Sequence, residues 1–346
     1  MINLEHPDID TSYDRQNMLS DYASWCDDGI KAAEAKLPSL PERKDGRLYY
    51  AGMGASAAPG EVISDYLSAE SGVELKVISS HLLPLGIEKK DILLAVSLSG
   101  STEETLAVVE KAVQAGVRVI GFSSGGRLKD VCDKNGLVHI QLDKRLTSRS
   151  SFPLIFGRVL AAMESIVGMN QLVQNAVESW ERIRKAMPSF MSLHLEGAPS
   201  SLARWLYNSP HITVYYSSYC PSLGRRMRNM LSENSKSRSS IEDIVEVQHD
   251  GITAWESDYG TKLLLLSSPY DDRFLTKRFS AVSDVVKSLG FGVRQLQMDS
   301  SGIEFFLKSI YYIDLTSIFL ALLKKIDPSI TRSQRLVRAR LDNSPA

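Results

Sequence analysis

The chain has 346 residues, and its 40 Lys and Arg against 41 Asp and Glu leave a net charge of −1 at pH 7. This length is sufficient for two domains, and a hydrophobic share of 43% is typical of globular proteins with sizeable cores. A charge so close to zero gives no global field to attract nucleic acid or an anionic membrane, so we expect neither as a partner.

The amino-terminal residues are polar and acidic, unlike a secretory signal, and three cysteines are too few for a disulfide framework. We therefore expect Cys26, Cys132 and Cys220 to be buried or free thiols in a reducing cytoplasm. The longest apolar run, near residues 310–323, is too short to span a bilayer and contains Asp314, so it predicts a buried helix.

Residues 18–37 alternate apolar and charged side chains at helical spacing, and Pro38 ends that pattern. Short apolar runs then alternate with helical stretches up to residue 142. The predicted strands are 48–51, 75–79, 92–97, 117–122 and 138–142, and the predicted helices are 57–68, 103–115 and 127–135. Apolar strands that alternate with helices predict a parallel sheet covered on both faces.

The pattern restarts after a mostly helical stretch at 152–200. Strands are predicted at 211–216, 244–247, 263–267 and 293–298, and helices at 221–234, 274–289 and, with a break at Asp327 and Pro328, 303–341. We therefore divide the chain into a helical extension (1–44), a first α/β domain with phosphate-binding loops (45–168), a helical connection (169–200), a second α/β domain (201–300) and a C-terminal helical segment (301–346).

The first motif, Gly52-Met53-Gly54-Ala55-Ser56, lies between a predicted strand and a predicted helix. That position is the sheet edge where open α/β proteins bind ligands, and a helix N-terminus favours an anion. The motif loosely matches a dinucleotide fingerprint, but the next strand ends without the carboxylate that a nicotinamide cofactor usually needs. A tight turn without a ligand is the alternative interpretation.

The second motif, at residues 97–102, places four hydroxyl side chains within six residues, before a helix that opens with two glutamates. A phosphate group needs several short donors, which hydroxyls and free helix N–H groups supply together. Ordinary N-capping would explain one hydroxyl and leave three unexplained, so the motif favours phosphate binding.

These two loops resemble the sugar-phosphate pocket of sugar-isomerase (SIS) domains. Further stretches extend the resemblance: residues 123–128 (SSGGRL), 149–153 (RSSFP), 232–236 (SENSK), 248–251 (QHDG) and 320–328 (LALLKKIDP). From about residue 45 to 340, the chain resembles the archaeal and actinobacterial-type bifunctional phosphoglucose/phosphomannose isomerases. The resemblance implies two tandem SIS domains, each a flavodoxin-like αβα sandwich around a parallel sheet, with extra N- and C-terminal helices.

The resemblance also implies a reaction, the interconversion of glucose 6-phosphate or mannose 6-phosphate with fructose 6-phosphate, without a cofactor. Glu233 would be the base that moves a proton between C1 and C2, and Arg149 would stabilise the enediolate. His249 would open the sugar ring from the partner subunit, which implies a homodimer, and Arg338 aligns with a lysine that contacts substrate near the ring oxygen. The phosphate would be held by Gly54, Ala55, Ser56, Ser97, Ser99 and Thr102.

These residue types also fit the reaction independently of the resemblance. Aldose–ketose isomerisation needs one carboxylate to move a proton and a cation beside the developing oxyanion. The six histidines are scattered, without the spacing of a zinc site, so we expect no metal. Each candidate also has a plainer interpretation: Glu233 at a solvated helix end, His249 in an exposed loop, and Arg149 in a surface ion pair. We interpret the basic run Arg225, Arg226 and Arg228 as a solvated or subunit-facing surface.

Four positions depart from the family pattern: Ala55, Ser232, Asp250 with Gly251, and Arg338. Arginine keeps the charge of the family lysine, but its guanidinium is planar and bulkier. Arg340 and Arg335 are the alternative positions if the register shifts. These departures keep a second hypothesis open, in which the chain binds sugar phosphate and regulates a partner without catalysis. A ketose–amine enzyme of the glucosamine-phosphate type and a dehydrogenase are weaker alternatives.

Overall fold

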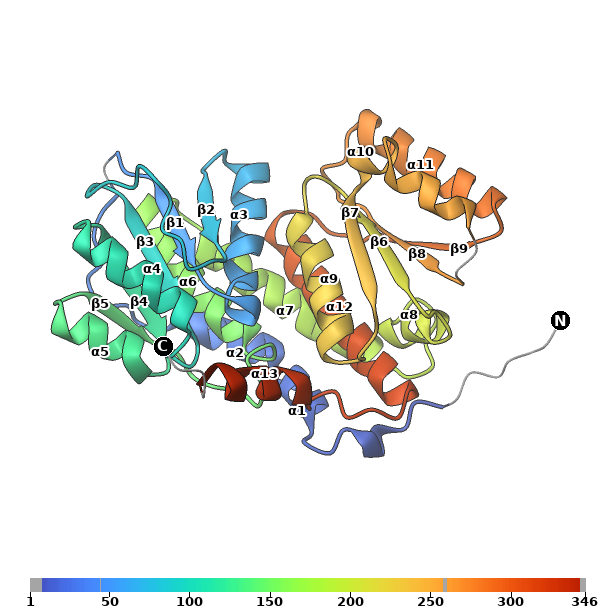
Figure 1. Cartoon of the computed structure of the whole chain (residues 1–346), viewed down its shortest axis with the longest axis horizontal. Helices are drawn as coiled ribbons and strands as arrows, with labels where there is room; N and C mark the ends of the chain where they lie inside the picture. Colours follow the sequence, from blue (N-terminus) through green and yellow to red (C-terminus); the bar gives the residue numbers. More distant parts are fainter. Residues whose placement is uncertain (1–7, 44, 258–259, 343–346) are drawn as a thin grey trace.

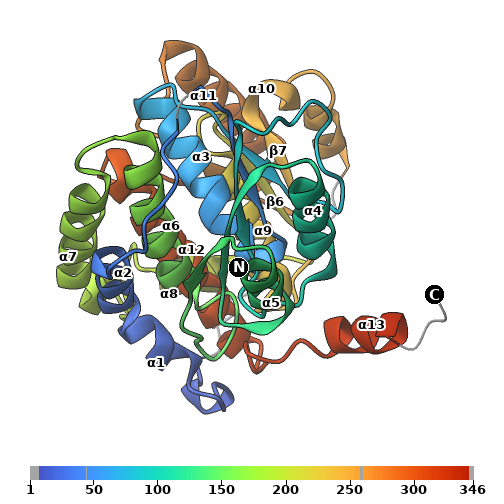
Figure 2. The same ribbon diagram turned by 90° about the vertical axis from the view of Figure 1, so that its left-hand side faces the viewer.

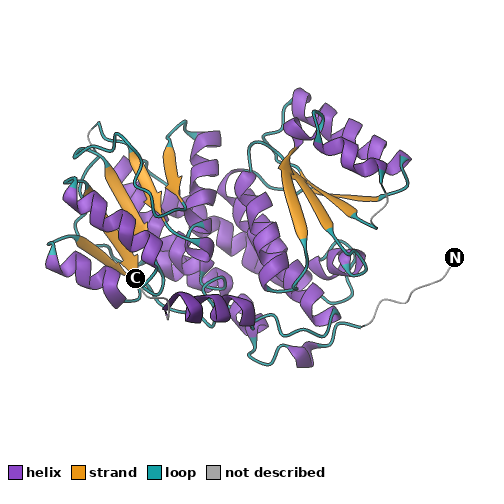
Figure 3. Ribbon diagram, in the orientation of Figure 1, coloured by secondary structure: helices purple, strands orange, loops and turns teal. Residues whose placement is uncertain are grey.

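The computed structural model describes residues 8–43, 45–257 and 260–342, which form two parallel sheets with helices on both faces of each (Figures 1 and 3). A 3-10 helix η1 (Thr11–Tyr13) and two helices, α1 (Met18–Ala23) and α2 (Trp25–Glu34), precede the first sheet. The predicted fold, two tandem α/β sandwiches with additional terminal helices, is confirmed. The exact domain boundaries remain a prediction.

The first sheet has the strand order β2-β1-β3-β4-β5, and all neighbouring strands are parallel. Its strands are β1 (Leu48–Ala51), β2 (Leu75–Ile78), β3 (Ile92–Val96), β4 (Arg118–Ser123) and β5 (Val138–Gln141). Helices α4 (Glu103–Gln114) and α5 (Gly126–Lys134) pack on one face, and α3 (Ala58–Glu70) and α6 (Phe152–Val167) on the other. Because both faces are covered, every residue of β3 is buried, which explains its unbroken apolar sequence.

The second sheet has the order β7-β6-β8-β9 and is also parallel. It comprises β6 (Ile212–Tyr216), β7 (Ser239–Asp243), β8 (Lys262–Leu266) and β9 (Gly292–Leu296). Apolar side chains of α10 (Ile244–Val247), the 3-10 helix η3 (Gly251–Glu256) and α11 (Arg273–Ser288) pack on one face, and those of α8 (Pro199–Leu206), α9 (Pro221–Glu233) and α12 (Gly302–Leu323) on the other.

One hydrophobic core joins the two halves, with α3 and α9 in contact between the sheets (Figure 1). Helix α12 lies in this core together with α7 (Leu172–Phe190). It is the one helix of the described residues that is long and apolar enough to cross a membrane, yet almost all of it is buried inside the protein. The prediction of a buried helix here is confirmed. The three cysteines are likewise buried and unbonded.

The other predicted strands are confirmed to within two residues at each end, but the strand predicted at 244–247 is wrong. That segment, apolar except for Glu246, forms α10, and the strand is the preceding polar segment, Ser239–Asp243. The Asp243 carboxylate caps α10 by accepting a hydrogen bond from the Val245 amide at 2.8 Å. A four-residue apolar run cannot distinguish strand from helix, and an edge strand such as β7 needs no continuous apolar sequence.

The predicted helix at 18–37 is also broken, since α1 ends at Ala23 and α2 begins at Trp25. The chain ends in α13 (Arg332–Asp342), which projects from the rest of the protein (Figure 2).

Candidate active site

The two hydroxyl-rich loops meet at the carboxyl ends of the neighbouring strands β1 and β3. The 3-10 helix η2 (Gly54–Ser56) forms the first loop, and Gly54 has a φ of +53°. The Ser56 hydroxyl accepts a hydrogen bond from the Leu98 amide at 3.3 Å, which fastens one loop to the other. The six predicted phosphate-binding residues therefore lie on two adjoining loops.

Within the second loop, the hydroxyls bond to each other and to the loop backbone. The hydroxyls of Ser97 and Thr102 are 2.8 Å apart, and the Ser99 hydroxyl accepts from the Ser101 amide at 3.2 Å. Thr102 occupies the N-cap position of α4 but makes no side-chain capping bond. Plain N-capping therefore does not explain these hydroxyls, while Ser99 and Gly54 are exposed to an approaching ligand.

Substitution of Gly100 tests whether the close packing of the second loop is needed for stability and phosphate binding. The φ of +70° at this glycine is strained for any other residue, and an added Cβ would lie 1.7 Å from the Gly125 carbonyl oxygen. We expect Gly100→Ala to lower the free energy of unfolding by more than about 2 kcal/mol and to weaken phosphate binding. The control is Gly72→Ala, where φ is +67° in open space and strain alone should cost about 1–2 kcal/mol. Equal losses in urea denaturation would contradict the predicted clash.

Arg149 lies three residues before α6, which contacts η2, and its buried guanidinium joins three separate segments. Nε donates to the Asn234 side-chain oxygen at 2.6 Å, and Nη2 donates to the Pro328 carbonyl at 2.7 Å. Nη1 donates to the Glu233 carboxylate at 3.2 Å, so the predicted base and the predicted cation form an ion pair. Burial lowers the pKa of Arg149, and the negative charge of Glu233 opposes that shift.

A second ion pair lies directly behind Arg149. Arg226 donates from Nε to Asp314 at 2.8 Å and from Nη2 to the Arg149 carbonyl at 3.0 Å. Asp314 also accepts from the Tyr22 hydroxyl at 2.8 Å. Arg226 is 2% exposed and Asp314 is fully buried, so the interpretation of Arg226 as a surface residue is wrong. Its partner Asp314 lies on α12, 88 residues away in sequence. The residues next to Arg226 in the sequence therefore do not indicate this buried ion pair.

Lys236 is a second cation at the site. It belongs to the SENSK stretch at residues 232–236, but the sequence analysis assigned it no role. Its ammonium group donates to the Glu233 carbonyl at 2.5 Å and to the Asn234 carbonyl at 3.3 Å. Burial, reinforced by the positive charge of Arg149, lowers the pKa of Lys236 to about 8. The lysine therefore loses its charge in the mildly alkaline range.

His249 does not join these residues within one chain. Its described hydrogen bond is to the neighbouring Gln248, and its side chain is exposed. Glu233 ends α9 shortly before β7 begins, whereas His249 follows α10 beyond the far end of that strand. The five residues of β7, a strand about 16 Å long, therefore lie between the two along the chain.

Arg338 also lies apart from Arg149 and Glu233. It is exposed on α13, which Figure 2 shows projecting from the body of the protein, and its side chain makes no ion pair with any residue that the structure describes. Across the same described residues, no group of three or more His, Cys, Asp and Glu side chains is arranged to hold a metal ion.

Two parallel sheets, the first with hydroxyl-rich loops at its strand ends, give the architecture of two tandem SIS domains. Residues 196–341 match the family described as bacterial phospho-glucose isomerase C-terminal SIS domain. The fold is similar to that of a hypothetical protein from Thermus thermophilus, with a TM-score of 0.73, 17% identity and coverage of 95% of this chain and 94% of that one. A glucosamine-6-phosphate deaminase from Thermotoga maritima gives a TM-score of 0.68 at 17% identity, with 90% and 96% covered.

The relatives are similar over most of their length. The bifunctional phosphoglucose/phosphomannose isomerase of Pyrobaculum calidifontis is 26% identical over 94% of this chain and 100% of its own. The D-glucosamine-6-phosphate 4-epimerase of Sulfolobus acidocaldarius is 26% identical over 73% of this chain and 78% of its own. The chain is thus similar over most of its length to bifunctional phosphoglucose/phosphomannose isomerases, and its residues 196–341 match an SIS-domain family of bacterial phospho-glucose isomerases.

Proposed function

We propose that this protein is a cytoplasmic aldose–ketose isomerase that interconverts glucose 6-phosphate, mannose 6-phosphate or both with fructose 6-phosphate. The observation that carries the proposal is the contact between the Glu233 carboxylate and the buried Arg149 guanidinium, 3.2 Å apart and supplied by opposite halves of the chain. The Glu233 side chain keeps 22% of its surface exposed, so a substrate can reach the carboxylate while Arg149 stays fixed behind it.

In the proposed mechanism, Gly54, Ala55, Ser56, Ser97, Ser99 and Thr102 hold the phosphate of the sugar. Glu233 removes the proton from C2 of the aldose, a proton passes from the O2 hydroxyl to O1, and Glu233 returns its proton to C1, which gives the ketose. Arg149 places its positive charge beside the enediolate oxygen as negative charge develops there. C1 is reduced as C2 is oxidised within the same sugar, an intramolecular oxidoreduction, so the proposal requires neither a redox cofactor nor a metal.

Ring opening is assigned to His249 of a second copy of the chain. The position of His249, beyond the far end of β7 from Glu233 and hydrogen-bonded to Gln248, supports a shared site in a homodimer, because the residue makes no described hydrogen bond to Arg149 or Glu233 of its own chain. The role of Arg338 beside the ring oxygen remains a prediction.

A coupled assay tests the isomerase. The purified protein is given fructose 6-phosphate, first without added metal and then with EDTA, and the formation of glucose 6-phosphate and mannose 6-phosphate is measured enzymatically. Glucosamine 6-phosphate is included, since one relative is an epimerase of that sugar. Product that forms in EDTA and disappears in Glu233→Gln supports the proposal.

The second candidate is a non-catalytic sugar-phosphate-binding protein that regulates a partner. It is favoured by the distance of both His249 and Arg338 from Glu233. If fructose 6-phosphate protects the protein against heat but no product forms, the isomerase proposal is refuted and this candidate replaces it.

Lys236 predicts the pH dependence of the reaction. Because its pKa is lowered to about 8, its charge is present below that pH and is lost above it. We expect kcat/KM, which reports groups of the free enzyme, to fall as the pH rises through about 8, since a positive charge beside Glu233 and the enediolate is removed. Lys236→Arg keeps its charge at these pH values and should move the fall to higher pH. An unchanged pH profile in this variant would show that another group titrates.

A further inference from the structure

The second sheet is covered unevenly on its face away from α9. On β8, Leu263 and Leu265 are fully buried beneath apolar side chains of α11. On the same face, the cross-strand neighbours Thr213 of β6 and Ser240 of β7 are polar, and Thr213 is partly exposed and Ser240 exposed. A parallel sheet that is covered on both faces normally presents apolar side chains. The polar half of this face therefore indicates a surface that meets water or a ligand rather than the protein core.

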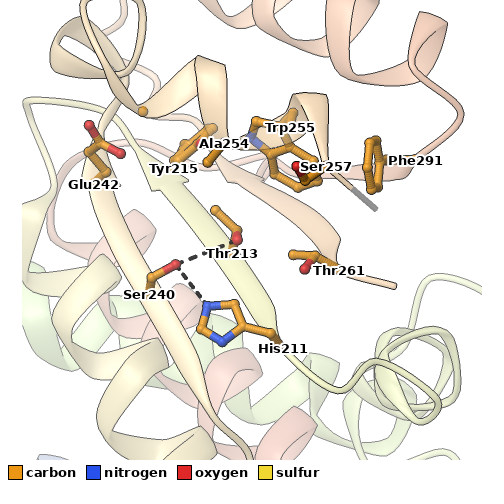
Figure 4. Close-up of a pocket in the computed structure, with 11 residues that line it drawn as sticks. His211, Thr213, Tyr215, Ser240, Glu242, Ala254, Trp255, Ser257, Thr261 and Phe291 are labelled. Carbon is orange, nitrogen blue, oxygen red and sulfur yellow. Dashed lines mark hydrogen bonds between the residues drawn. The ribbon is translucent and has the colours of Figure 1, made fainter. Parts of the chain in front are cut away.

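A groove of about 420 Å³ lies over this polar half of the sheet (Figure 4). Sites for small molecules typically have volumes of about 300–1,000 Å³. Helix η3 and Phe291 form the opposite wall, where the rings of Trp255 and Phe291 meet edge to face at 4.9 Å. The Trp255 indole donates to the Tyr215 hydroxyl at 2.8 Å, which holds this wall against the sheet. The groove therefore has one aromatic side and one polar side.

The polar side is a row of three hydrogen-bonding groups. The Ser240 hydroxyl lies 3.0 Å from His211 Nε2 and 3.5 Å from the Thr213 hydroxyl oxygen (Figure 4). Within the described residues, the Thr213 hydroxyl donates to no other group, so its proton is available to a ligand. Because hydroxyls both donate and accept, such a row suits a ligand with several neighbouring hydroxyl groups of its own.

Glu242 gives the groove a negative charge. It is the one carboxylate among the described lining residues, none of which is lysine or arginine, and it forms no ion pair within the described part of the chain. Burial, and then the negative charge of Asp250, raises the pKa of Glu242, as expected for a carboxylate without a nearby cation. Between residues 239 and 261 the sequence has six acidic residues and no lysine or arginine. The groove therefore disfavours a phosphorylated ligand and favours a cationic one.

Gly251 leaves the space that this carboxylate occupies. A Cβ added at Gly251 would lie 2.3 Å from Glu242 Oε2, so a larger residue would displace the carboxylate. Gly251 is also one of the positions that depart from the family pattern. The position of Glu242 in the groove thus depends on a residue that the family pattern lacks.

We propose that this groove is a second ligand site, which binds an unphosphorylated amino sugar in its ammonium form. The ammonium group donates to Glu242, and the ring hydroxyls bond to the row of Thr213, Ser240 and His211. The apolar face of the sugar ring lies against the wall that contains Trp255. An amine with a purely apolar body would leave the hydroxyl row without partners, which lowers affinity.

This site is separate from the proposed catalytic pair, because Glu233 ends α9 and α9 packs on the other face of the second sheet. The proposal of an amino-sugar site therefore does not rest on the proposed function.

Ligand-observed NMR titrations of the native protein near neutral pH test the assignment. We expect glucosamine to bind at least about tenfold more tightly than glucose, which lacks the ammonium group, and than phenethylamine, which lacks the hydroxyls. Fructose 6-phosphate should not displace glucosamine, because the two ligands are assigned to different sites. Absence of glucosamine binding, equally tight binding of glucose or phenethylamine, or displacement by fructose 6-phosphate would each overturn the proposal.

Glu242→Gln removes the charge and keeps nearly the same shape. We expect it to weaken glucosamine binding at least about tenfold and to change glucose binding by less than about twofold. The control is Glu246→Gln, the same change at an exposed position of α10 that does not line the groove, and it should bind glucosamine as the native protein does.

If circular dichroism shows that Glu242→Gln is not folded, Gly251→Ala decides. The φ of Gly251 is not in the left-handed region, so the backbone accepts alanine, while the new Cβ displaces the end of the flexible Glu242 side chain. This variant should keep the stability of the native protein and bind glucosamine at least about tenfold more weakly. Unchanged glucosamine binding in the variant that decides would refute the proposal.

Discussion

Glu233→Gln is expected to lower kcat for sugar-phosphate isomerisation by about 10³-fold or more while sugar-phosphate binding persists. The amide has nearly the shape of the carboxylate, and its oxygen still accepts from Arg149, which contacts Glu233 at 3.2 Å. It cannot take up and return the proton that moves between C2 and C1. The rate is measured in the coupled assay, and binding is measured as the rise in melting temperature with fructose 6-phosphate.

A matched control is Glu181→Gln, which makes the same chemical change at an exposed position of α7. Its kcat should equal that of the native protein. Full activity in Glu233→Gln would identify another group as the base and would leave the contact with Arg149 as an ordinary ion pair. Loss of both rate and binding would instead mean that Glu233 helps to hold the ground-state sugar.

Much of the fold could be predicted because the central strands are buried on both faces, and their continuous apolar sequences indicate this burial. Residues Ile92–Val96 are all apolar since both faces of β3 are covered, and the glycine-rich turn after β1 marks a strand–helix junction. The edge strand Ser239–Asp243 could not be found in this way. It is polar and partly exposed, and the apolar run beside it belongs to α10.

The candidate site also has parts that the local sequence indicates and parts that it does not. The phosphate loops are local, so their hydroxyl spacing was visible in the sequence. The family resemblance placed Arg149 and Glu233 in one site, but their ion pair was not predicted. The burial of Arg226 was not visible, because the residue stands in a basic run and its partner is 88 residues away. His249 is harder still, since the catalytic pair that it would serve is proposed to belong to a second copy of the chain.

Asp314→Ala is expected to lower the free energy of unfolding by about 3–5 kcal/mol, because it leaves the guanidinium of Arg226 buried without its counter-charge. Asp314 is fully buried, and it accepts from Arg226 Nε at 2.8 Å and from the Tyr22 hydroxyl at 2.8 Å. Urea denaturation measures the loss. Asp299→Ala is the control: Asp299 pairs with Lys308 but its side chain is 88% exposed, so that loss should stay below about 1 kcal/mol.

The double variant Arg226→Met with Asp314→Leu separates stability from positioning. Replacing both buried charges with apolar side chains should restore most of the lost stability, since no unpaired charge remains. It also removes the hydrogen bond from Arg226 to the Arg149 carbonyl, 3.0 Å long in the native protein, so the proposed catalytic guanidinium loses its support. We therefore expect a stable protein with a lowered kcat and little change in KM. If the double variant recovered both stability and rate, the buried pair would be a folding element alone, and Asn234 and Pro328 would suffice to hold Arg149 against Glu233.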